Sequence, residues 1–324
     1  MRRKTDKRHK FVRLLLYRIL AVLIVVAIIA AIRALWLRHE AAVNPPVVSN
    51  DSSEPNGFIQ TDPDKPLYVL LVGTDKGTPE QANFVGVAAV NQIKHHIDLV
   101  MLPDDTKIEG RKEKGIQALQ DVYSEGGLTL TKAVVEDILH VPIPYYVAFT
   151  EDSFADMVKM SGGVPLYVEK DMVHEDAGTG ATDINLFQGY QDLDGQEATG
   201  YMRYLDNDGY VARSQRQERL IKNFYEDRQQ RFGIFNAIFM YRLWQHVDSN
   251  IPAKAMFDLA WNFRNVTVDN LDFYILPGEM APSGKADDPK WYWTFDPVEV
   301  QKVIGRTSNA ITSAPAPSDN GATN

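Results

Sequence analysis

Short runs of consecutive apolar residues alternate with segments of helical period along most of this chain. The first pattern is typical of buried strands, and the second is typical of amphipathic helices. The pattern predicts strands at 67–72, 84–90, 97–102, 145–149, 164–168 and 271–276, and helices at 115–124, 128–140, 151–160, 195–205, 232–246, 252–263 and from 297. Interleaved strands and helices indicate an α/β fold: a single three-layer domain with a central mixed sheet and helices on both faces.

A longer apolar run near the start of the chain has a different meaning. Every residue from 19 to 32 is apolar, and the run extended to 14–37 reaches the roughly 20 residues that cross a bilayer. Basic residues precede it, which predicts that residues 1–13 form a cytoplasmic tail and that the main domain lies outside. We expect one N-terminal transmembrane helix at 14–37, and the alternatives are a cleaved signal peptide and a buried core helix.

Two further segments have the composition of linkers. Residues 38–66 are rich in Pro, Ser, Asn and Asp, and residues 307–324 are rich in Ser, Ala and Pro. Such segments bury too little apolar surface to fold alone, so we expect a linker and a disordered tail. One extracytoplasmic domain at 67–306 remains between them.

Charge and cysteine content exclude several classes of function. Residues 1–18 carry a net charge of +7, so the rest of the chain carries −16 of the total of −9. A basic end suits an anionic membrane surface, whereas an acidic body disfavours general nucleic-acid binding. The chain has no cysteine, which excludes disulfides, thiolate metal sites and a cysteine nucleophile.

Three arginines flank a short loop between two predicted helices. Arg203 lies at the end of the first helix, and Arg213 and Arg216 lie near the start of the second. Guanidinium groups keep their charge, and each can bind two phosphate oxygens at once. If the three converge, they form a site for a phosphate or a pyrophosphate. The alternative is a pair of surface helices whose arginines are neutralised by Asp206, Asp208 and Glu218. The segment before these helices, 189–195, is rich in Gly and Asp and is expected to form turns.

This stretch resembles the C-terminal signature of the LytR–CpsA–Psr family. The matching residues are Gly189, Leu193, Gly195, Ala198, Tyr201, Arg203, Arg213, Arg216 and Gln217. Weaker matches upstream and downstream are VLLVGTD, LPDDT, EGG, VPIPYYVAF, SGGVPLYV and YILPGE. Members of the family are membrane-anchored phosphotransferases that move a glycopolymer from a polyprenyl-diphosphate carrier to the cell wall. The resemblance implies that activity, a place in the cell membrane, and three partners: the polyprenyl-linked glycopolymer, a cell-wall acceptor and the membrane.

The resemblance also implies roles for single residues. Arg203, Arg213 and Arg216 would be catalytic and, with Gln217, would bind the diphosphate, while Asp75 would hold Mg²⁺. Asp75 follows the first predicted strand, at the kind of strand end where open α/β sheets bind ligands. Carboxylate and phosphate oxygens are suitable ligands for Mg²⁺. The alternative for Asp75 is an aspartate that only forms a turn.

The chain departs from the family pattern at five positions, which makes it a divergent member. They are Gln81, Asn83, Asp104, Leu205 and Tyr210. Asn83 removes a metal-binding carboxylate and weakens the Mg²⁺ site, whereas Asp104 and Leu205 each replace an arginine. Two lost phosphate contacts cost about 3–6 kcal/mol of binding, at roughly 1.5–3 kcal/mol each. The alternative function is therefore a non-catalytic protein of the same fold that binds polyprenyl phosphate lipids or serves as an envelope scaffold.

Other residues are weaker candidates. Seven apolar residues would either line the family's lipid pocket or fill the core: Phe84, Val87, Val100, Ile138, Tyr146, Phe149 and Phe154. His95 and His96 are adjacent on a predicted turn, which is the wrong spacing for two ligands on one face, so we expect both to be solvated. His174, Glu175 and Asp176 would form either a cation site or a solvated acidic loop.

Overall fold

The computed structural model describes residues 58–60, 62, 64–75, 77, 80–111, 115–175, 180–232, 236–285 and 289–309. The predicted transmembrane helix, the basic tail and most of the linker lie outside these residues. Among the described residues, no helix has both the length and the apolar character needed to cross a membrane.

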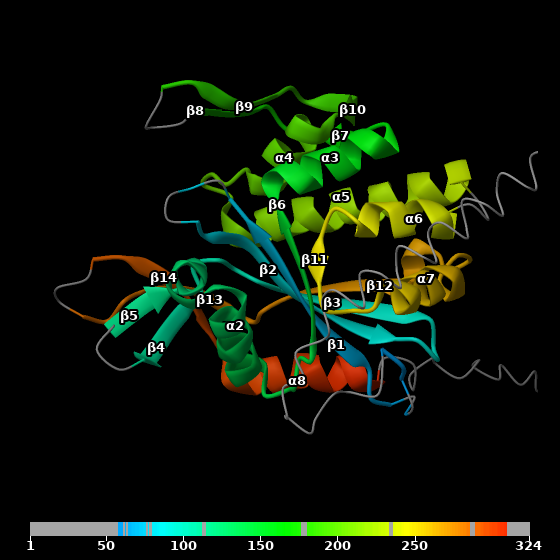
Figure 1. The fold of residues 1–324 in the computed structure, drawn as a ribbon. Coiled ribbons are helices and arrows are strands. Elements are labelled where there is room, and N and C mark those ends of the chain that lie inside the picture. The colour runs from blue at the N-terminus through cyan, green and yellow to red at the C-terminus, as the bar shows by residue number, and fades with distance from the viewer. Residues whose placement is uncertain are drawn as a thin grey trace, which may run out of the picture. The chain divides into compact units, whose positions relative to one another are not determined.

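A six-stranded mixed sheet forms the centre of the domain (Figure 1). Its strands, in spatial order, are β11 (Asp248–Ser249), β6 (Tyr145–Thr150), β1 (Leu67–Thr74), β2 (Ala82–Asn91), β3 (His96–Leu102) and β12 (Leu271–Ile275). The pairs β1–β6 and β3–β12 are parallel, and the other pairs are antiparallel. β1 and β2, in the middle of the sheet, are apolar along most of their length because helices cover both faces of the sheet.

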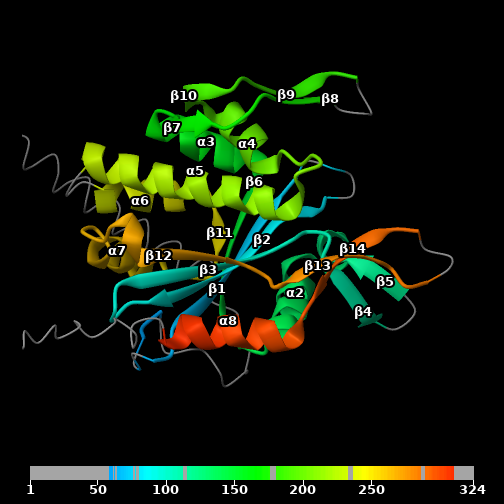
Figure 2. The same ribbon diagram turned by 180° about the vertical axis from the view of Figure 1, so that it is seen from behind.

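The helices divide between the two faces (Figures 1 and 2). One face packs against α2 (Leu119–Leu139) and α8 (Pro297–Asn309). The other face packs against α5 (Gly209–Phe232), α6 (Asn236–Trp244) and α7 (Ala253–Asn262). The predicted α/β fold, with a central mixed sheet and helices on both faces, is confirmed.

Smaller elements surround these layers. Beyond α5 lie α3 (Glu151–Ser161), α4 (Gly195–Arg203), β7 (Val164–Val168), β8 (Met172–Glu175), β9 (Thr182–Leu186) and β10 (Gly189–Leu193). Near α2 lie the hairpins of β4 (Lys107–Arg111) with β5 (Gly115–Ala118) and of β13 (Gly278–Pro282) with β14 (Trp291–Phe295). A short 3₁₀ helix, η2 (Val268–Asn270), precedes β12.

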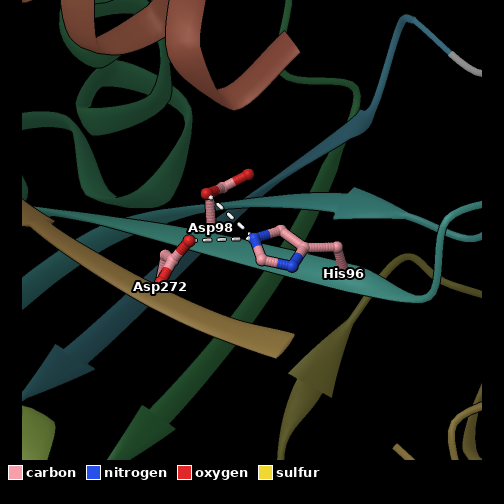
Figure 3. Close-up of side chains that lie close together, drawn as sticks. All are labelled: His96, Asp98 and Asp272. Atoms are coloured by element: carbon pink, nitrogen blue, oxygen red, sulfur yellow. Dashed lines mark hydrogen bonds and ion pairs between the residues drawn. The ribbon is translucent and has the colours of Figure 1, made fainter. Parts of the chain in front are cut away.

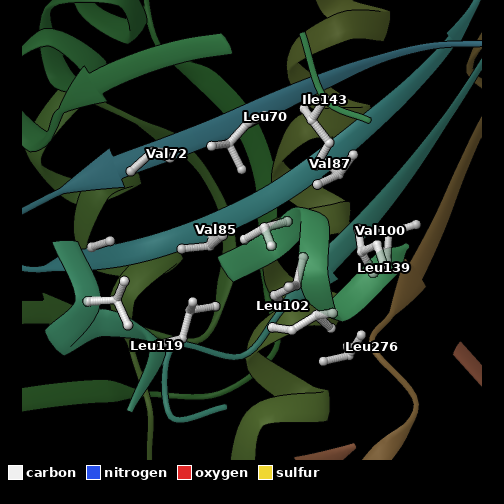
Figure 4. Close-up of a cluster of buried hydrophobic side chains, with 14 of the residues drawn as sticks. Leu70, Val72, Val85, Val87, Val100, Leu102, Leu119, Leu139, Ile143 and Leu276 are labelled. Carbon is white, nitrogen blue, oxygen red and sulfur yellow. The ribbon is translucent and has the colours of Figure 1, made fainter. Parts of the chain in front are cut away.

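The core between the sheet and α2 is tightly packed. Figure 4 shows side chains from β1, β2 and β3 meeting Leu119 and Leu139 of α2, both fully buried. Four of the seven candidates for a lipid pocket pack in this core rather than around a ligand site: Val87, Val100, Ile138 and Tyr146.

Two predicted segments differ from the structure. Residues 115–118 were expected to start a helix, but they form β5, because Lys107 and Ile108 of β4 pair with them in a hairpin. The expected turns at 189–195 contain β10, which pairs antiparallel with β7 along its whole length. The partner of β5 is β4, which is too polar for its local pattern to indicate a strand. The partner of β10 is β7, which is distant in the sequence.

The two ends of the described domain extend beyond the expected boundaries. Phe58, in the expected linker, is 3% exposed and packs edge-on against Tyr145 with ring centres 4.8 Å apart. At the other end, α8 continues to Asn309, and Ile304 and Thr307 are buried in that helix.

The start of α4 depends on a glycine. Asp194 caps this helix by accepting hydrogen bonds from the backbone N–H groups of Gln196 and Glu197, both through Oδ1. A Cβ atom on Gly195 would lie 2.2 Å from the backbone oxygen of Ala155 in α3, so only glycine allows α3 and α4 to pack this closely.

Gly195→Ala is therefore expected to lower the free energy of unfolding by about 1–3 kcal/mol, because the clash is with backbone. The matched control is Gly305→Ala in α8, where a Cβ would meet nothing within 4 Å. That change should be neutral or stabilise by up to about 1 kcal/mol through helix propensity. Chemical denaturation of the full-length chain measures both, and equal effects of the two changes would contradict this packing.

Candidate functional site

A pocket lies at the carboxyl ends of the parallel strands β1 and β6, the region where α/β sheets bind ligands. It contains about 340 Å³ of space, part of which is open to solvent. Its lining residues come from three strands and three helices: Gly73, Thr74, Asn83, Phe84, Phe149, Glu151, Phe154, Thr199, Met202, Arg203, Arg213 and Gln217. The pocket thus combines charged groups with an aromatic wall.

The aromatic wall consists of three phenylalanines. The ring centres of Phe84 and Phe149 are 5.8 Å apart, and those of Phe149 and Phe154 are 6.2 Å apart. Gly73 lets the first two rings approach, since a Cβ there would lie 2.8 Å from the ring of Phe149. These are the three lipid-pocket candidates that do line a pocket.

Arg203 enters the pocket from the end of α4 and meets two carboxylates. Its Nη1 donates to both oxygens of Glu151, at 3.2 and 3.3 Å, and its Nη2 donates to Asp183 at 2.5 Å. Burial lowers the pKa of Arg203, but the two carboxylates outweigh burial and leave the pKa raised. About a third of the side chain is exposed, at 31%. Arg203 is therefore a charged group with access to a ligand, and its charge is already balanced.

Asn83 lies at a β-bulge where β1 and β2 change register. Such an extra residue changes the direction of a side chain at the edge of a pairing. Here the Nδ2 of Asn83 donates to Oε1 of Glu151 at 2.7 Å. Asn83 therefore helps to hold the Glu151 carboxylate in the pocket, in addition to Arg203.

Arg213 enters the pocket from the first turns of α5 and is 7% exposed. Its Nη1 donates to Asp104 at 2.9 Å, and its Nη2 donates to the backbone oxygen of Asn83 at 2.7 Å. Among the residues that the structure describes, its buried Nε has no hydrogen-bond partner, and neither does Oδ1 of Asp104. Burial raises the pKa of Asp104, and the nearby Arg213 opposes that effect. Asp104 lines a small adjoining pocket together with Arg213 and Gln217, so it neutralises Arg213 at the site itself.

Arg216 was expected to join the other two arginines, but the structure gives it a different set of partners. Its side chain is 1% exposed and does not line either described pocket. Its guanidinium donates to Asp208 and to the backbone oxygen of Tyr204, both at 2.8 Å, and lies 3.5 Å from Glu169. Through Asp208 and Tyr204, Arg216 is bound to the loop between α4 and α5. Gln217, in contrast, lines the pocket and donates to the backbone oxygen of Met202 at 3.2 Å.

Asp75 follows β1 directly, as expected. Its Oδ1 accepts hydrogen bonds from the backbone N–H groups of Gly77 at 3.0 Å and Gln81 at 2.9 Å, so this oxygen forms a turn. Within the described residues its Oδ2 accepts no hydrogen bond. Because Thr74 pairs with Thr150 in parallel register, Asp75 and Glu151 follow neighbouring strand ends. One carboxylate oxygen, completed by phosphate and water oxygens, fits Mg²⁺.

The other departures from the family pattern have structural partners or are exposed. Gln81 donates to Asp121 at 2.8 Å, Tyr210 donates to Asp105, and Leu205 is 37% exposed.

His174 and Asp183 lie 2.5 Å apart in an ion pair on β8 and β9, while Asp176 lies outside the described residues.

Glu151 and Asp183 contact Arg203 at the site, although the sequence pattern did not indicate either residue. Glu151 stands directly after a predicted strand, as Asp75 does, and that position was a usable signal. Asp183 reaches Arg203 from β9, a strand whose place beside α4 no local pattern indicates.

The buried pair of Arg213 and Asp104 is testable by a double-mutant cycle. Arg213→Met leaves Asp104 buried without its partner, so it is expected to destabilise the fold by about 3–5 kcal/mol. The double variant Arg213→Met/Asp104→Asn is expected to be clearly more stable than this single variant. Urea denaturation measures each free energy of unfolding, with Lys254→Met at an exposed ion pair as the control, expected within about 1 kcal/mol of wild type. Additive effects of the two changes would contradict the coupling.

Comparison with known proteins gives one consistent result. The model of the LytR_cpsA_psr family matches residues 38–309. The chain is 26% identical over 264 residues to the polyisoprenyl-teichoic acid–peptidoglycan teichoic acid transferase TagU of Bacillus cereus, which covers 78% of this chain and 81% of that relative. It is 25% identical over 269 residues to TagU of Bacillus licheniformis, covering 81% of this chain and 84% of the relative.

Solved structures share the fold. TagV of B. subtilis has a TM-score of 0.63 at 21% identity, covering 76% of this chain and 98% of TagV. TagT bound to LIIa-WTA has a TM-score of 0.59 at 20% identity, covering 78% of this chain and 93% of TagT. With the family model spanning the whole described domain, this chain belongs to the LytR–CpsA–Psr family.

Proposed function

We propose that this protein is an envelope phosphotransferase that moves a glycopolymer from a polyprenyl-diphosphate carrier to a cell-wall acceptor. The family and the names of the TagU relatives support this class of reaction. The observation that carries the proposal is one pocket in which Arg203, Arg213 and Gln217 meet the aromatic wall. Such a pocket suits a ligand with a phosphate head and an apolar chain.

The transfer step requires a nucleophile, a leaving group and a proton acceptor. A hydroxyl of the wall acceptor attacks the phosphorus bonded to the glycopolymer, and a new P–O bond forms. The bond from that phosphorus to the bridging oxygen breaks, and polyprenyl monophosphate leaves with the electron pair. Glu151 is the carboxylate that lines the pocket, and we assign it as the group that accepts the hydroxyl proton.

Binding relies on two guanidinium groups rather than three. Arg213 contributes its buried Nε, and Arg203 contributes its partly exposed guanidinium. A phosphate that replaces Glu151 or Asp183 at Arg203 keeps the charge of that site balanced. Arg216 instead holds the loop that joins α4 to α5. Asp75 would hold Mg²⁺, which when bound would neutralise phosphate charge.

A second function is favoured by a specific observation. Both pocket arginines already have carboxylate partners, Asp104 for Arg213 and Glu151 with Asp183 for Arg203. A pocket with this charge balance binds a diphosphate less strongly than one with free guanidinium groups. The second candidate is therefore a non-catalytic member that is anchored in the membrane and binds polyprenyl phosphate lipids or serves as a scaffold.

The two candidates differ in one assay. The full-length chain is incubated with a polyprenyl-diphosphate glycan, a wall acceptor and Mg²⁺, and released polyprenyl phosphate is measured. The enzyme is expected to release product, and Arg203→Ala is expected to lower kcat/KM by at least tenfold through a lost phosphate contact. Lys254→Ala, on the exposed side of α7, should match wild type. Binding without product would support the second candidate, and no binding would refute both.

Glu151→Gln separates binding from proton transfer. The change removes a carboxylate partner of Arg203, so affinity for a polyprenyl phosphate is expected to rise. It also removes the proton acceptor, so turnover is expected to fall by 10²–10⁴-fold, the usual size of general-base effects. Calorimetry and the release assay measure the two quantities. If both fall together, Glu151 is a substrate-binding residue, and the assigned role is wrong.

A further inference from the structure

A second group of polar side chains lies at the opposite end of the sheet, away from the pocket. His96 and Asp98 come from the start of β3, and Asp272 comes from β12 (Figure 3). The Nε2 of His96 lies 3.3 Å from Oδ1 of Asp98 and 3.2 Å from Oδ2 of Asp272. The ligand atoms of all three residues lie within 4.8 Å of one another. His96 was expected to be solvated, but it is only 7% exposed, so that expectation is wrong.

Strand geometry produces this arrangement. His96 and Asp98 are two residues apart on β3, so their side chains lie on the same face of the sheet. Asp272 is the register partner of Asp98 in the parallel pairing of β12 with β3, which places its side chain on that face as well. Asp98 is 1% exposed, whereas the side chain of Asp272 is 51% exposed. The group is therefore buried on one side and open to solvent on the other.

The protein balances the charges of this group only in part, through His96 and a hydrogen bond from the Tyr274 hydroxyl to Asp98. A single ring nitrogen faces both carboxylates, and it can carry only one proton. In the described part of the chain, no Lys or Arg forms an ion pair with Asp98 or Asp272. Even a doubly protonated imidazole leaves one excess negative charge, and like charges directly opposite on neighbouring strands are unfavourable. A bound cation would remove that imbalance.

The distances indicate which cation fits. Charge-assisted N–H···O bonds are usually about 2.7–2.9 Å long, and both contacts of His96 are longer. Ligands about 2.0–2.1 Å from a tetrahedral ion are about 3.3–3.4 Å from each other, which follows from the tetrahedral angle and the lengths of zinc–nitrogen and zinc–oxygen bonds. The two separations of His96, 3.3 and 3.2 Å, are close to this value. An imidazole ligand also favours Zn²⁺ and related ions over Mg²⁺ and Ca²⁺, which prefer oxygen ligands alone.

We propose that His96, Asp98 and Asp272 bind a divalent transition-metal ion, with Zn²⁺ as the test case and solvent as a fourth ligand on the exposed side of Asp272. The ion joins the edge strand β12 to β3, and through β12 it fixes the chain that leads to β13 and α8. The site is structural and independent of the transfer reaction proposed for the pocket. It lies at the amino ends of β3 and β12, whereas the pocket lies at the carboxyl ends of β1 and β6.

The test is metal-dependent stability of the full-length chain. After treatment with a chelator, the protein is titrated with ZnCl₂, and thermal unfolding and calorimetry are recorded. Wild type is expected to bind one Zn²⁺ and to gain several degrees in Tm, because an ion that binds only the folded state stabilises it. MgCl₂ at the same concentration should give no such shift. Co²⁺ should give the visible absorption bands of a tetrahedral ion.

Matched variants locate the effect. Asp272→Asn alters a half-exposed ligand and should abolish the Zn²⁺ shift while leaving the metal-free Tm close to that of metal-free wild type. His95→Asn removes the neighbouring histidine, and asparagine tolerates the positive φ of 52° at that position, so its Zn²⁺ shift should equal that of wild type. His174→Asn, at an exposed His–Asp pair, should also keep the shift.

Three results would overturn the proposal. The first is a wild-type chain with no Zn²⁺-dependent change in Tm or heat. The second is an equal Zn²⁺ shift in Asp272→Asn, which would place the binding elsewhere. The third is a Co²⁺ spectrum of octahedral type. This test uses the wild-type chain alone, so it does not depend on the folding of any variant.

Discussion

The parallel pairing of β1 with β6 in the middle of the sheet is the constraint on which the candidate site depends. Its register places Thr74 beside Thr150, so the chain leaves both strands at the same edge, and Asp75 and Glu151 follow neighbouring strand ends. The bulge in β2 then points Asn83 at Glu151. A shift of one residue in this register would send these side chains to the opposite face. The position of the pocket thus depends on strand pairing more than on any single residue.

Charge balance is the second organising feature of the site. Each pocket arginine has a carboxylate partner, and the Arg213–Asp104 pair is almost completely buried. Burying such a pair costs desolvation energy that mutual attraction recovers only with good geometry. Within the described part of the chain, Nε of Arg213 and Oδ1 of Asp104 are buried without a hydrogen-bond partner, so the recovery is incomplete. In the function that we propose, a phosphate that accepts from Nε would complete the hydrogen bonding of Arg213.

The same logic of register applies at the far end of the sheet. The β3–β12 pairing sets Asp272 opposite Asp98, and strand alternation adds His96 on the same face. At the pocket, guanidinium groups offset the carboxylates. At the far end, in the described part of the chain, a single imidazole faces two of them. Because of this difference in local charge, we propose an anionic ligand for the pocket and a cation for the far end.

The pattern of apolar residues by itself determined the α/β class, most strands of the central sheet and the helices on its two faces, because burial of both faces leaves long apolar runs. It also placed Asp75 and Arg203 at element ends. Only the tertiary structure decided three outcomes. Arg216 binds Asp208 and does not line the pocket, Asp104 neutralises Arg213, and His96 is buried. Each of these outcomes depends on a partner from another part of the chain. Side-chain ionic contacts of that kind depend on three-dimensional packing and have no local sequence period.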